Sequence, residues 1–395
     1  MIDLNRKSNS AIKFIILMGF VSLFSDIVYE GARSISGPYL GLLGASATAI
    51  SLTAGLGEFI GYAFRLVSGY FADKTKRYWL LTFLGYLMNL LAIPTLALVG
   101  KWQLAVLLLI AERFGKAIRK PARDTMMSFA VKQVGAGWGF GLEEALDQIG
   151  AVTGPVILSV ALALKSGGEI LRYKFAFSLL LVPALISLLL LTIGRVLFPT
   201  PSDFEKNTPV KSTHVVNKSF RWYLIAISFI AAGFADFPLI AYHFSKINLM
   251  SSSLIPLFYS IAMGIDAVAA VVFGRLFDKR GLIVLIISSS LGAFFAPLIF
   301  LTKNLFAIVL GVCLWGIGIG AQESILKAVV ANLIPVEKRG TAYGIFNTVF
   351  GFAWFLGSLL MGVLYDISLV LLVIFSVLME LLSIVMIIFM NRSSQ

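Results

Sequence analysis

Residues 340–365 read GTAYGIFNTVFGFAWFLGSLLMGVLY, a run without Asp, Glu, Lys or Arg. Residues 78–100, 175–194 and 281–302 share this lack of charge. Each run is long enough to cross a bilayer as a helix, which needs about 20 apolar residues. A membrane β-barrel would instead show short segments with alternating polarity, so helices are the remaining way to span. The sequence therefore predicts an all-α membrane protein.

Composition excludes several other classes of protein. Of the 395 residues, 59% are hydrophobic and 13% are charged, whereas an ordinary soluble domain has about 25% charged residues. The single cysteine, Cys313, excludes a disulfide within the chain, and the two histidines, His214 and His243, exclude a multi-histidine metal site. No G-x-x-x-x-G-K-[ST] loop is present. We therefore expect no enzyme and no cofactor, with a proton gradient as the energy source.

Turn residues and charge clusters divide the chain into twelve expected membrane-spanning helices. Their expected ranges are 12–40, 46–73, 78–99, 102–130, 137–164, 172–197, 220–245, 251–277, 281–302, 304–332, 340–365 and 368–390.

The positions of the basic residues predict the topology. Most Lys and Arg fall in segments that share one side with the N-terminal residues 1–11. By the positive-inside rule, both termini lie in the cytoplasm, which fits a multi-pass protein of the plasma membrane. The net charge of +12 is then a topology signal, with added attraction to anionic lipids of the bilayer and no nucleic-acid partner. The opposite side holds six basic loop residues: Lys101, Lys165, Arg172, Lys174, Lys246 and Lys303.

Two halves repeat a pattern across the chain. Residues 198–219 are rich in Pro, Ser and Thr and predict a cytoplasmic linker between six-helix bundles at 12–197 and 220–391. Gly69-Tyr-Phe-Ala-Asp73-Lys74 matches Gly274-Arg-Leu-Phe-Asp278-Lys279, and the small-xxx-small pattern of Gly137 and Gly141 recurs at Gly340 and Gly344. These two matches, in corresponding spans, indicate an internal duplication, which is usual in secondary transporters.

The chain resembles the major facilitator superfamily over essentially its whole length. The loop 69–77 is similar to that family's signature, although Lys76 stands where glycine is usual, and the second copy keeps this glycine as Gly281. The Gly150-x-x-x-Gly154-Pro155 element resembles a fifth-span signature of exporting, proton-antiporting branches, without its trailing small residues. The resemblance implies a cytoplasmic gate formed by Gly69, Asp73, Arg77, Asp124, Gly274, Asp278 and Gly340.

Ionisable residues inside the spans predict the transport site. A charged side chain at mid-membrane costs roughly 2.5–3.5 kcal/mol on insertion scales, so each needs a reason to be there. Spans three, six and nine have no charged interior residue and the twelfth has only Glu380, so we expect these four to face lipid. The expected cavity residues are Asp26, Glu30, Arg33, Glu58, Glu112, Arg113, Asp147, Asp236 and Asp266.

Asp26, Glu30 and Arg33 form one polar stripe because their spacing is i, i+4 and i+7. We expect Asp26 and Glu30 to bind a proton or a cationic group of the substrate, with Arg113 or Arg33 as the counter-charge. The alternative is that such charges only pair to hold helices together. We expect Glu143 to be solvated near the cytoplasmic interface, and His243 to lie at the outer interface.

These features favour a secondary active transporter that moves a small organic solute by alternating access, coupled to protons, as a monomer. Export by antiport is preferred over uptake. The alternatives are a proton-coupled uptake permease and a membrane receptor or lipid-handling protein that uses the same fold without coupled transport.

Overall fold

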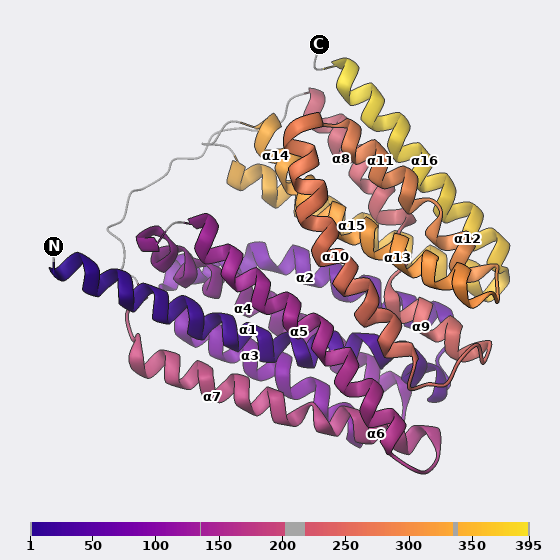
Figure 1. Ribbon diagram of the computed structural model, residues 1–395, viewed down its shortest axis with the longest axis horizontal. Helices are drawn as coiled ribbons and strands as arrows, with labels where there is room; N and C mark the ends of the chain where they lie inside the picture. The colour runs from indigo at the N-terminus through magenta and orange to yellow at the C-terminus, as the bar shows by residue number, and fades with distance from the viewer. Residues whose placement is uncertain (1, 135, 202–217, 335–338, 394–395) are drawn as a thin grey trace. The chain divides into compact units, whose positions relative to one another are not determined.

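The computed structural model describes residues 2–134, 136–201, 218–334 and 339–393, and the regular structure in these ranges is helical (Figure 1). The predicted all-α membrane fold is confirmed. In the described part of the chain, 11 helical segments are long and apolar enough to cross a membrane. The predicted fourth span is missing from these because its helix, α4 (Trp102–Val134), is 33 residues long but carries charged side chains along its length.

The chain packs as two compact units. Unit 1 comprises Met1–Arg33 and Ile60–Pro209, and unit 2 comprises Ser34–Phe59 and Val210–Gln395. Helices α1 (Ile2–Leu42) and α2 (Ala47–Thr75) therefore contribute to both units. Residues 202–217 of the predicted linker lie outside the described residues, so the bundle limits 12–197 and 220–391 stay predictions.

Unit 1 holds the first part of α1, the second part of α2, and the helices up to the linker. After α4, the chain forms α5, and the predicted sixth span is two helices that meet at Leu180. The remaining helices of unit 1 are α3 (Tyr78–Thr95), η1 (Leu96–Leu98), α5 (Ala136–Leu164), α6 (Glu169–Leu179) and α7 (Leu181–Leu197).

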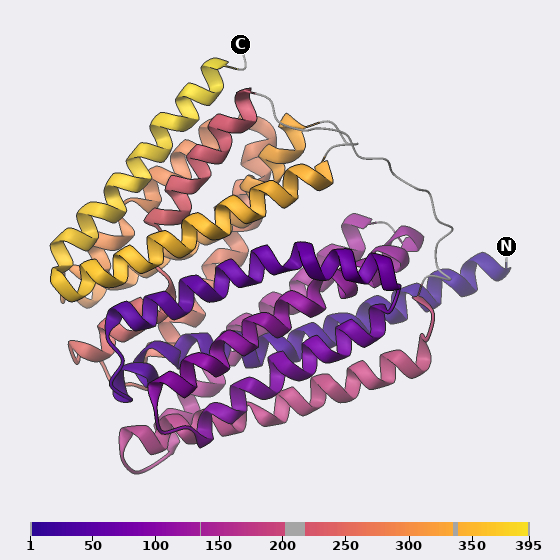
Figure 2. The same ribbon diagram turned by 180° about the vertical axis from the view of Figure 1, so that it is seen from behind.

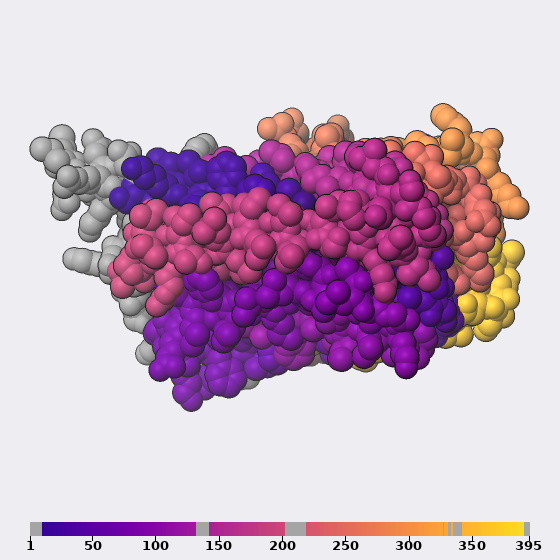
Figure 3. Space-filling view, turned by 90° about the horizontal axis from the view of Figure 1, so that it is seen from below, coloured from indigo at the N-terminus to yellow at the C-terminus, as the bar shows by residue number. Residues whose placement is uncertain are grey.

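Helix α7 packs along unit 1 between α1 and α3, as Figure 3 shows, where its pink surface runs between indigo α1 and purple α3. The Ser187 hydroxyl of α7 donates a hydrogen bond to the Val21 carbonyl of α1 at 2.9 Å. Trp79 of α3 donates to the Phe198 carbonyl at 3.0 Å, just after α7 ends. The first bond ties α7 to α1, and the second ties α3 to the end of α7.

Unit 2 holds the second six predicted spans, several of them interrupted. Spans seven, nine and ten each consist of more than one helical segment. Their segments, with the uninterrupted helices, are α8 (Lys218–Gly233), α9 (Phe237–Lys246), α10 (Ile255–Arg280), α11 (Ile283–Gly292), α12 (Phe295–Phe300), α13 (Leu305–Ala321), the π-helical turn η3 (Gln322–Leu326), α14 (Lys327–Leu333), α15 (Arg339–Ile367) and α16 (Leu369–Ser393).

The break in the predicted seventh span is stabilised by side chains from other helices. Backbone groups inside a membrane protein need internal hydrogen-bond partners, because the bilayer supplies none. The Gly233 carbonyl accepts from the Ser376 hydroxyl at 2.6 Å, and the Ala235 carbonyl accepts from the Trp315 indole at 2.8 Å. The break therefore has fixed partners on α16 and α13. Helices α8, α11 and α16 lie side by side in both views (Figures 1 and 2).

Candidate functional site

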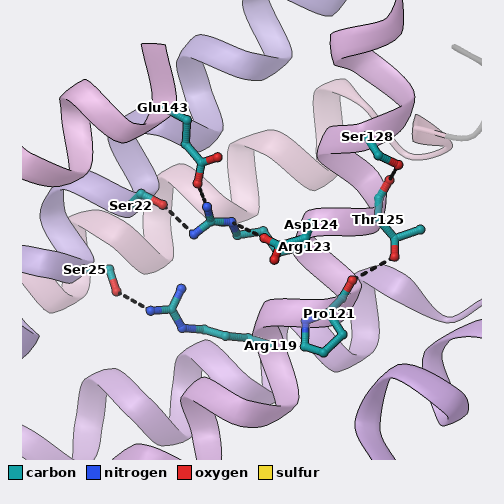
Figure 4. A network of polar contacts seen from close by, with 9 residues as sticks. All are labelled: Ser22, Ser25, Arg119, Pro121, Arg123, Asp124, Thr125, Ser128 and Glu143. Carbon is teal, nitrogen blue, oxygen red and sulfur yellow. Dashed lines mark hydrogen bonds and ion pairs between the residues drawn. The ribbon is translucent and has the colours of Figure 1, made fainter. Parts of the chain in front are cut away.

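One face of α4 carries a row of basic side chains that points toward α1. Arg113, Lys116, Arg119 and Arg123 are three or four residues apart, so they share one side of the helix. The Arg119 guanidinium donates to the Ser25 hydroxyl at 3.2 Å, and Arg123 donates to the Ser22 hydroxyl at 2.6 Å (Figure 4). Two arginines of α4 thus reach across to α1 within unit 1.

Helix α5 brings acidic residues to the same place. Glu143 pairs with Arg123 (Figure 4), and Asp147 lies one turn further along the helix. The carboxylate of Asp147 interacts with the charge of Arg123 and with the hydroxyl of Ser22. The acids of α5 and the bases of α4 therefore meet beside Ser22.

Two glycines let α5 approach α1 closely behind Asp26. A Cβ atom on Gly150 would lie 3.1 Å from Cβ of Asp26, and one on Gly154 would lie 3.0 Å from the Gly31 amide nitrogen. Real Cβ atoms rarely come this close to such neighbours, so larger residues would push the helices apart. The Gly-x-x-x-Gly element thus sets the distance between Asp26 and the acids of α5.

We refer to the ionisable residues of α1, α4 and α5 that meet here as the charge cluster. The charges of Asp147 and Glu30 repel a charge on Asp26, whereas those of Lys116 and Arg119 attract it. Neighbouring carboxylates in a buried site favour taking up a proton, and neighbouring cations oppose this. The charge cluster consists of Asp26, Glu30, Arg113, Lys116, Arg119, Arg123, Glu143 and Asp147.

Tyr29 of α1 lies between several cations at one end of the charge cluster. The Lys116 ammonium is 3.4 Å from the centroid of the Tyr29 ring, and the Arg113 guanidinium carbon is 4.6 Å from it. The Tyr29 hydroxyl accepts hydrogen bonds from Arg113 and, at 3.2 Å, from Arg33. The two predicted counter-charges, Arg113 and Arg33, are therefore both held by one tyrosine, which the sequence did not single out.

Glu112 belongs to a buried network behind this face of α4. Its carboxylate is 3.3 Å from the Arg113 guanidinium and accepts a hydrogen bond of 2.5 Å from the Asn89 amide of α3. Its role is to orient Arg113 and to tie α4 to α3.

The other predicted cavity acids belong to unit 2. Asp236, at the start of α9, accepts hydrogen bonds from the Trp354 indole at 2.8 Å and from the Ser358 hydroxyl at 3.1 Å. Asp266 is 2% exposed and packs against Gly320 of α13. Glu58 is half-buried in the part of α2 that belongs to unit 2. The role of these three acids in a transport cavity stays a prediction.

The predicted gate residues sit at helix ends. Asp73, Arg77 and Asp278 are exposed, while Asp124 lies 3.7 Å from the Arg123 guanidinium. Gly69 packs against Pro121, and Gly274 packs against Ser324. The roles of these residues stay predictions, as do those of Pro155 within α5 and of the glycines whose surroundings lie outside the described residues, namely Gly137, Gly141 and Gly340.

One departure from the family's loop pattern has a visible backbone consequence. Lys76 has φ = 55°, and Gly281 at the corresponding place in the second half has φ = 61°. Residues with a side chain rarely adopt this conformation, which glycine tolerates. Lys76 therefore keeps the turn of the repeat without the glycine that favours it.

Three residues were misplaced by the sequence. Arg119 and Arg123, inside the expected span 102–130, were counted among the cytoplasmic basic residues that set the topology, but they are 3% and 6% exposed and bond to Ser25 and Ser22 of α1. Glu143, expected in solvent, is 8% exposed because it pairs with Arg123. The regular spacing of the basic residues from Arg113 to Arg123 is the signal that could have identified the row.

His243 is buried in unit 2, and its expected place at the outer membrane interface stays a prediction. It is 1% exposed, and its Nδ1 atom lies 3.0 Å from the Tyr365 hydroxyl. In the described part of the chain, no three His, Cys, Asp or Glu side chains are grouped in a way that could hold a metal ion.

Comparisons with known proteins identify relatives over the full length of the chain. The family model described as Major Facilitator Superfamily matches residues 15–358 and 237–394. An uncharacterised protein of Mycobacterium tuberculosis is 37% identical over 98% of this chain and 94% of its own length. An uncharacterised MFS-type transporter of Methanocaldococcus jannaschii is 29% identical over 92% of this chain and 91% of its own length.

The fold is similar to that of solved transporters. The crystal structure of the nucleoside transporter NupG superposes with a TM-score of 0.73, covering 96% of this chain and 98% of that one at 13% sequence identity. At this identity the similarity concerns the fold alone.

Proposed function

The chain belongs to the major facilitator superfamily and is a membrane transporter, not an enzyme, and we propose that its charge cluster couples the movement of a small organic solute to protons. The proposal concerns the solute, the direction of transport and the energy source, and the charge cluster supplies the arguments for each. The observation that carries the proposal is the meeting of Asp26 and Asp147 beside Lys116 and Arg119.

The charge cluster is balanced when all of its members are ionised. It contains four acids, Asp26, Glu30, Glu143 and Asp147, and four bases, Arg113, Lys116, Arg119 and Arg123. A proton taken up by an acid leaves one positive charge in excess, and a cationic group that enters beside Asp26 has the same electrostatic effect as that proton. Solute and proton therefore compete for one negative charge, which is the physical basis of antiport.

Asp26 and Asp147 are the proposed proton-binding pair. Glu143 has its own partner in Arg123, and Glu112 is bound by Arg113 and Asn89. The negative charge of Asp147 opposes ionisation of Asp26, so a proton on Asp26 lowers the energy of the cluster while Asp147 is ionised. The Gly150 and Gly154 contacts with α1 hold this pair at a fixed separation.

Export from the cell by antiport is the proposed direction. It is supported by the Gly150-x-x-x-Gly154-Pro155 element, which resembles the signature of exporting branches and packs directly behind Asp26. We also propose that both termini lie in the cytoplasm and that the protein is in the plasma membrane; the distribution of basic residues supports this orientation of the termini. A monomer is the proposed functional state.

The test is a screen of organic cations, anions and neutral solutes in proteoliposomes with an imposed pH gradient. We expect at least one solute to accumulate against its gradient when the proton gradient is present, and a protonophore to stop the accumulation. Asp26→Asn should lower gradient-driven accumulation of the solute at least tenfold, because residue 26 can then no longer release a proton. Exchange of solute without a gradient should continue.

The matched control is Glu169→Gln, since Glu169 pairs with Arg172 at 2.5 Å on the exposed end of α6, away from the charge cluster. It should behave like the wild type. Gradient-driven accumulation that is unchanged in Asp26→Asn would refute the coupling role. A protein that binds solutes but moves neither solute nor protons would favour the receptor alternative.

A further inference from the structure

Glu380 is a buried acid far along the chain from the charge cluster. It lies in the middle of α16 and contacts Gly233 at the end of α8 and Gly292 at the end of α11, and it is 1% exposed. Its helix was expected to face lipid, and most of its other side chains fit that role. The carboxyl group points into the protein, where nothing in the proposed transport cycle uses it.

Neither oxygen of the Glu380 carboxyl group has a hydrogen-bond partner in the part of the chain that the structure describes. The hydroxyl group of Ser289 on α11 is the polar group that acts on the Glu380 carboxyl group. No charged group acts on it. The carboxyl carbon lies close to Gly292, where an added Cβ atom would be 3.8 Å away. The acid therefore occupies an apolar, uncharged site between three helices.

No base described on the neighbouring helices acts on an ionised Glu380. Helices α11 and α12 contain no titratable residue in their sequences. The titratable side chains described on the other helices that pack against α16 are Arg221 and Tyr223 of α8, and Tyr343, Tyr365 and Asp366 of α15. None of these interacts electrostatically with Glu380.

An ionised carboxylate without a partner in such a site costs several kcal/mol, whereas a protonated carboxyl group is neutral and can donate to Ser289. We propose that Glu380 is a second proton-binding site, located in unit 2 and separate from the charge cluster. It holds a proton while α8, α11 and α16 are packed together, and it releases the proton when this packing opens to water.

The proton then acts as a ligand that selects one arrangement of these helices. A ligand that binds one state more tightly stabilises that state. Here the packed state binds the proton more tightly than a hydrated state does, so low pH stabilises the packing and rising pH weakens it. The charge cluster is not required for this behaviour, so the inference does not depend on the proposed coupling.

The break in the seventh span is the place where such an opening would act. Gly233, the last residue of α8, packs so closely on α16 that an added Cβ atom would lie 3.4 Å from the Glu380 amide nitrogen and 3.0 Å from the Ser376 carbonyl oxygen. Ser376 also binds the Gly233 carbonyl. Opening around Glu380 therefore releases the end of α8 and allows the broken span to bend.

Infrared spectroscopy of the purified full-length protein tests the protonation state directly. We expect the wild type at neutral pH to show the carbonyl band of a protonated carboxyl group in apolar surroundings. This band should be missing in Glu380→Gln and retained in the control Glu169→Gln. A spectrum of Glu380→Gln that differs from wild type only in the bands of an ionised carboxylate would overturn the proposal.

Cysteine labelling tests the link between the proton and packing. Ser383 is 0% exposed, one turn beyond Glu380, so a water-soluble maleimide reaches Ser383→Cys only when the packing opens; Cys313→Ser removes the native thiol. Glutamine mimics the protonated acid, so Ser383→Cys is labelled both with Glu380 present and with Glu380→Gln. Dividing the first labelling rate by the second removes the effect of pH on the reactivity of the thiol. We expect this ratio to rise by about tenfold per pH unit over the range in which Glu380 is ionised in the opened, hydrated state but still protonated in the packed state. A ratio that stays constant from pH 6 to 9 would refute the link.

Discussion

Arg123 is the residue on which most of the charge cluster's structure depends. It is 6% exposed and bonds to Ser22 of α1 and Glu143 of α5 (Figure 4), so it joins three helices from its position on α4. Removing one partner of a buried ion pair leaves the other charged and unpaired, which costs more than the pair itself is worth.

We expect Arg123→Gln to lower the stability of the protein by about 3–5 kcal/mol, because Glu143 stays buried without its base. The double variant Arg123→Gln with Glu143→Gln should recover a large part of this loss. Thermal unfolding in detergent measures both. The control Glu169→Gln breaks an ion pair whose acid is 45% exposed and should cost within about 1 kcal/mol. Equal losses in the single and double variants would show that the ion pair is not the cause.

At the scale of secondary-structure elements, we expect substitutions in the two corresponding turns, at Lys76 and Gly281, to change stability in opposite directions. Lys76 and Gly281 both have positive φ, and such a conformation costs a residue with a side chain roughly 1–2 kcal/mol. Lys76→Gly should therefore keep or raise the thermal stability by up to about 1 kcal/mol, and Gly281→Ala should lower it by about 1–3 kcal/mol. Comparing their unfolding temperatures is the measurement. A similar decrease in both would show that the backbone conformation does not control these turns.

A second element-scale prediction concerns the first turn of α2. The Asp366 carboxylate at the end of α15 accepts hydrogen bonds from the Ala47 amide at 3.3 Å and from the Thr48 amide at 2.9 Å. It also accepts from the Thr48 hydroxyl at 2.6 Å. The carboxylate thus satisfies amides that no residue within the helix can pair.

Asp366→Ala should destabilise this turn by about 0.5–2 kcal/mol, as the loss of other helix caps does. Hydrogen exchange should become faster in peptides that contain Ala47 and Thr48. Ser46→Ala is the control, since the Ser46 hydroxyl accepts only from the Ala49 amide within the same turn; it should affect α2 but leave exchange near the end of α15 unchanged. Unaltered exchange at Ala47 in Asp366→Ala would contradict the role of the carboxylate.

The sequence predicted the elements well where apolar length determines them, and poorly where a partner determines them. The uncharged run 340–365 lies within one helix, α15, whereas 175–194 contains the junction of α6 and α7 and 281–302 divides into α11 and α12. The break after Gly233 could not be predicted, since it depends on Ser376 and Trp315, which are distant in sequence. Local patterns do not reveal which hydroxyl or indole will replace a lost backbone partner.

At the scale of the whole molecule, the repeat and the family were predictable, whereas the composition of the site was only partly so. Asp26, Glu30, Arg113 and Asp147 were identified because charges are costly inside a membrane. Arg119 and Arg123 were assigned to topology, because the positive-inside rule applies equally to a loop arginine and to one that turns inward. Glu380 was recognised as the only charge in its span, but its burial depends on how α16 packs against α8 and α11.

The two units arrange their ionisable residues differently. Unit 1 contains the charge cluster, in which acids and bases are interleaved, while Asp236 and Asp266 are individually buried in unit 2. The proposed site at Glu380 adds a proton-binding group to unit 2 that lacks any basic partner. Protons would then act on both units by different means, through competition with solute in unit 1 and through helix packing in unit 2.

The most direct test of proton coupling is to measure protons released by the detergent-solubilised transporter when a transported solute from the liposome screen is added in weakly buffered solution. A pH-sensitive dye reports the release. The account predicts that an exported cationic solute displaces protons from the wild type, and that Asp26→Asn with Asp147→Asn, which lacks the negative charges for which solute and proton compete, binds the solute more weakly and releases no protons. Solute binding without proton release by the wild type, or an equal release by the double variant, would contradict it.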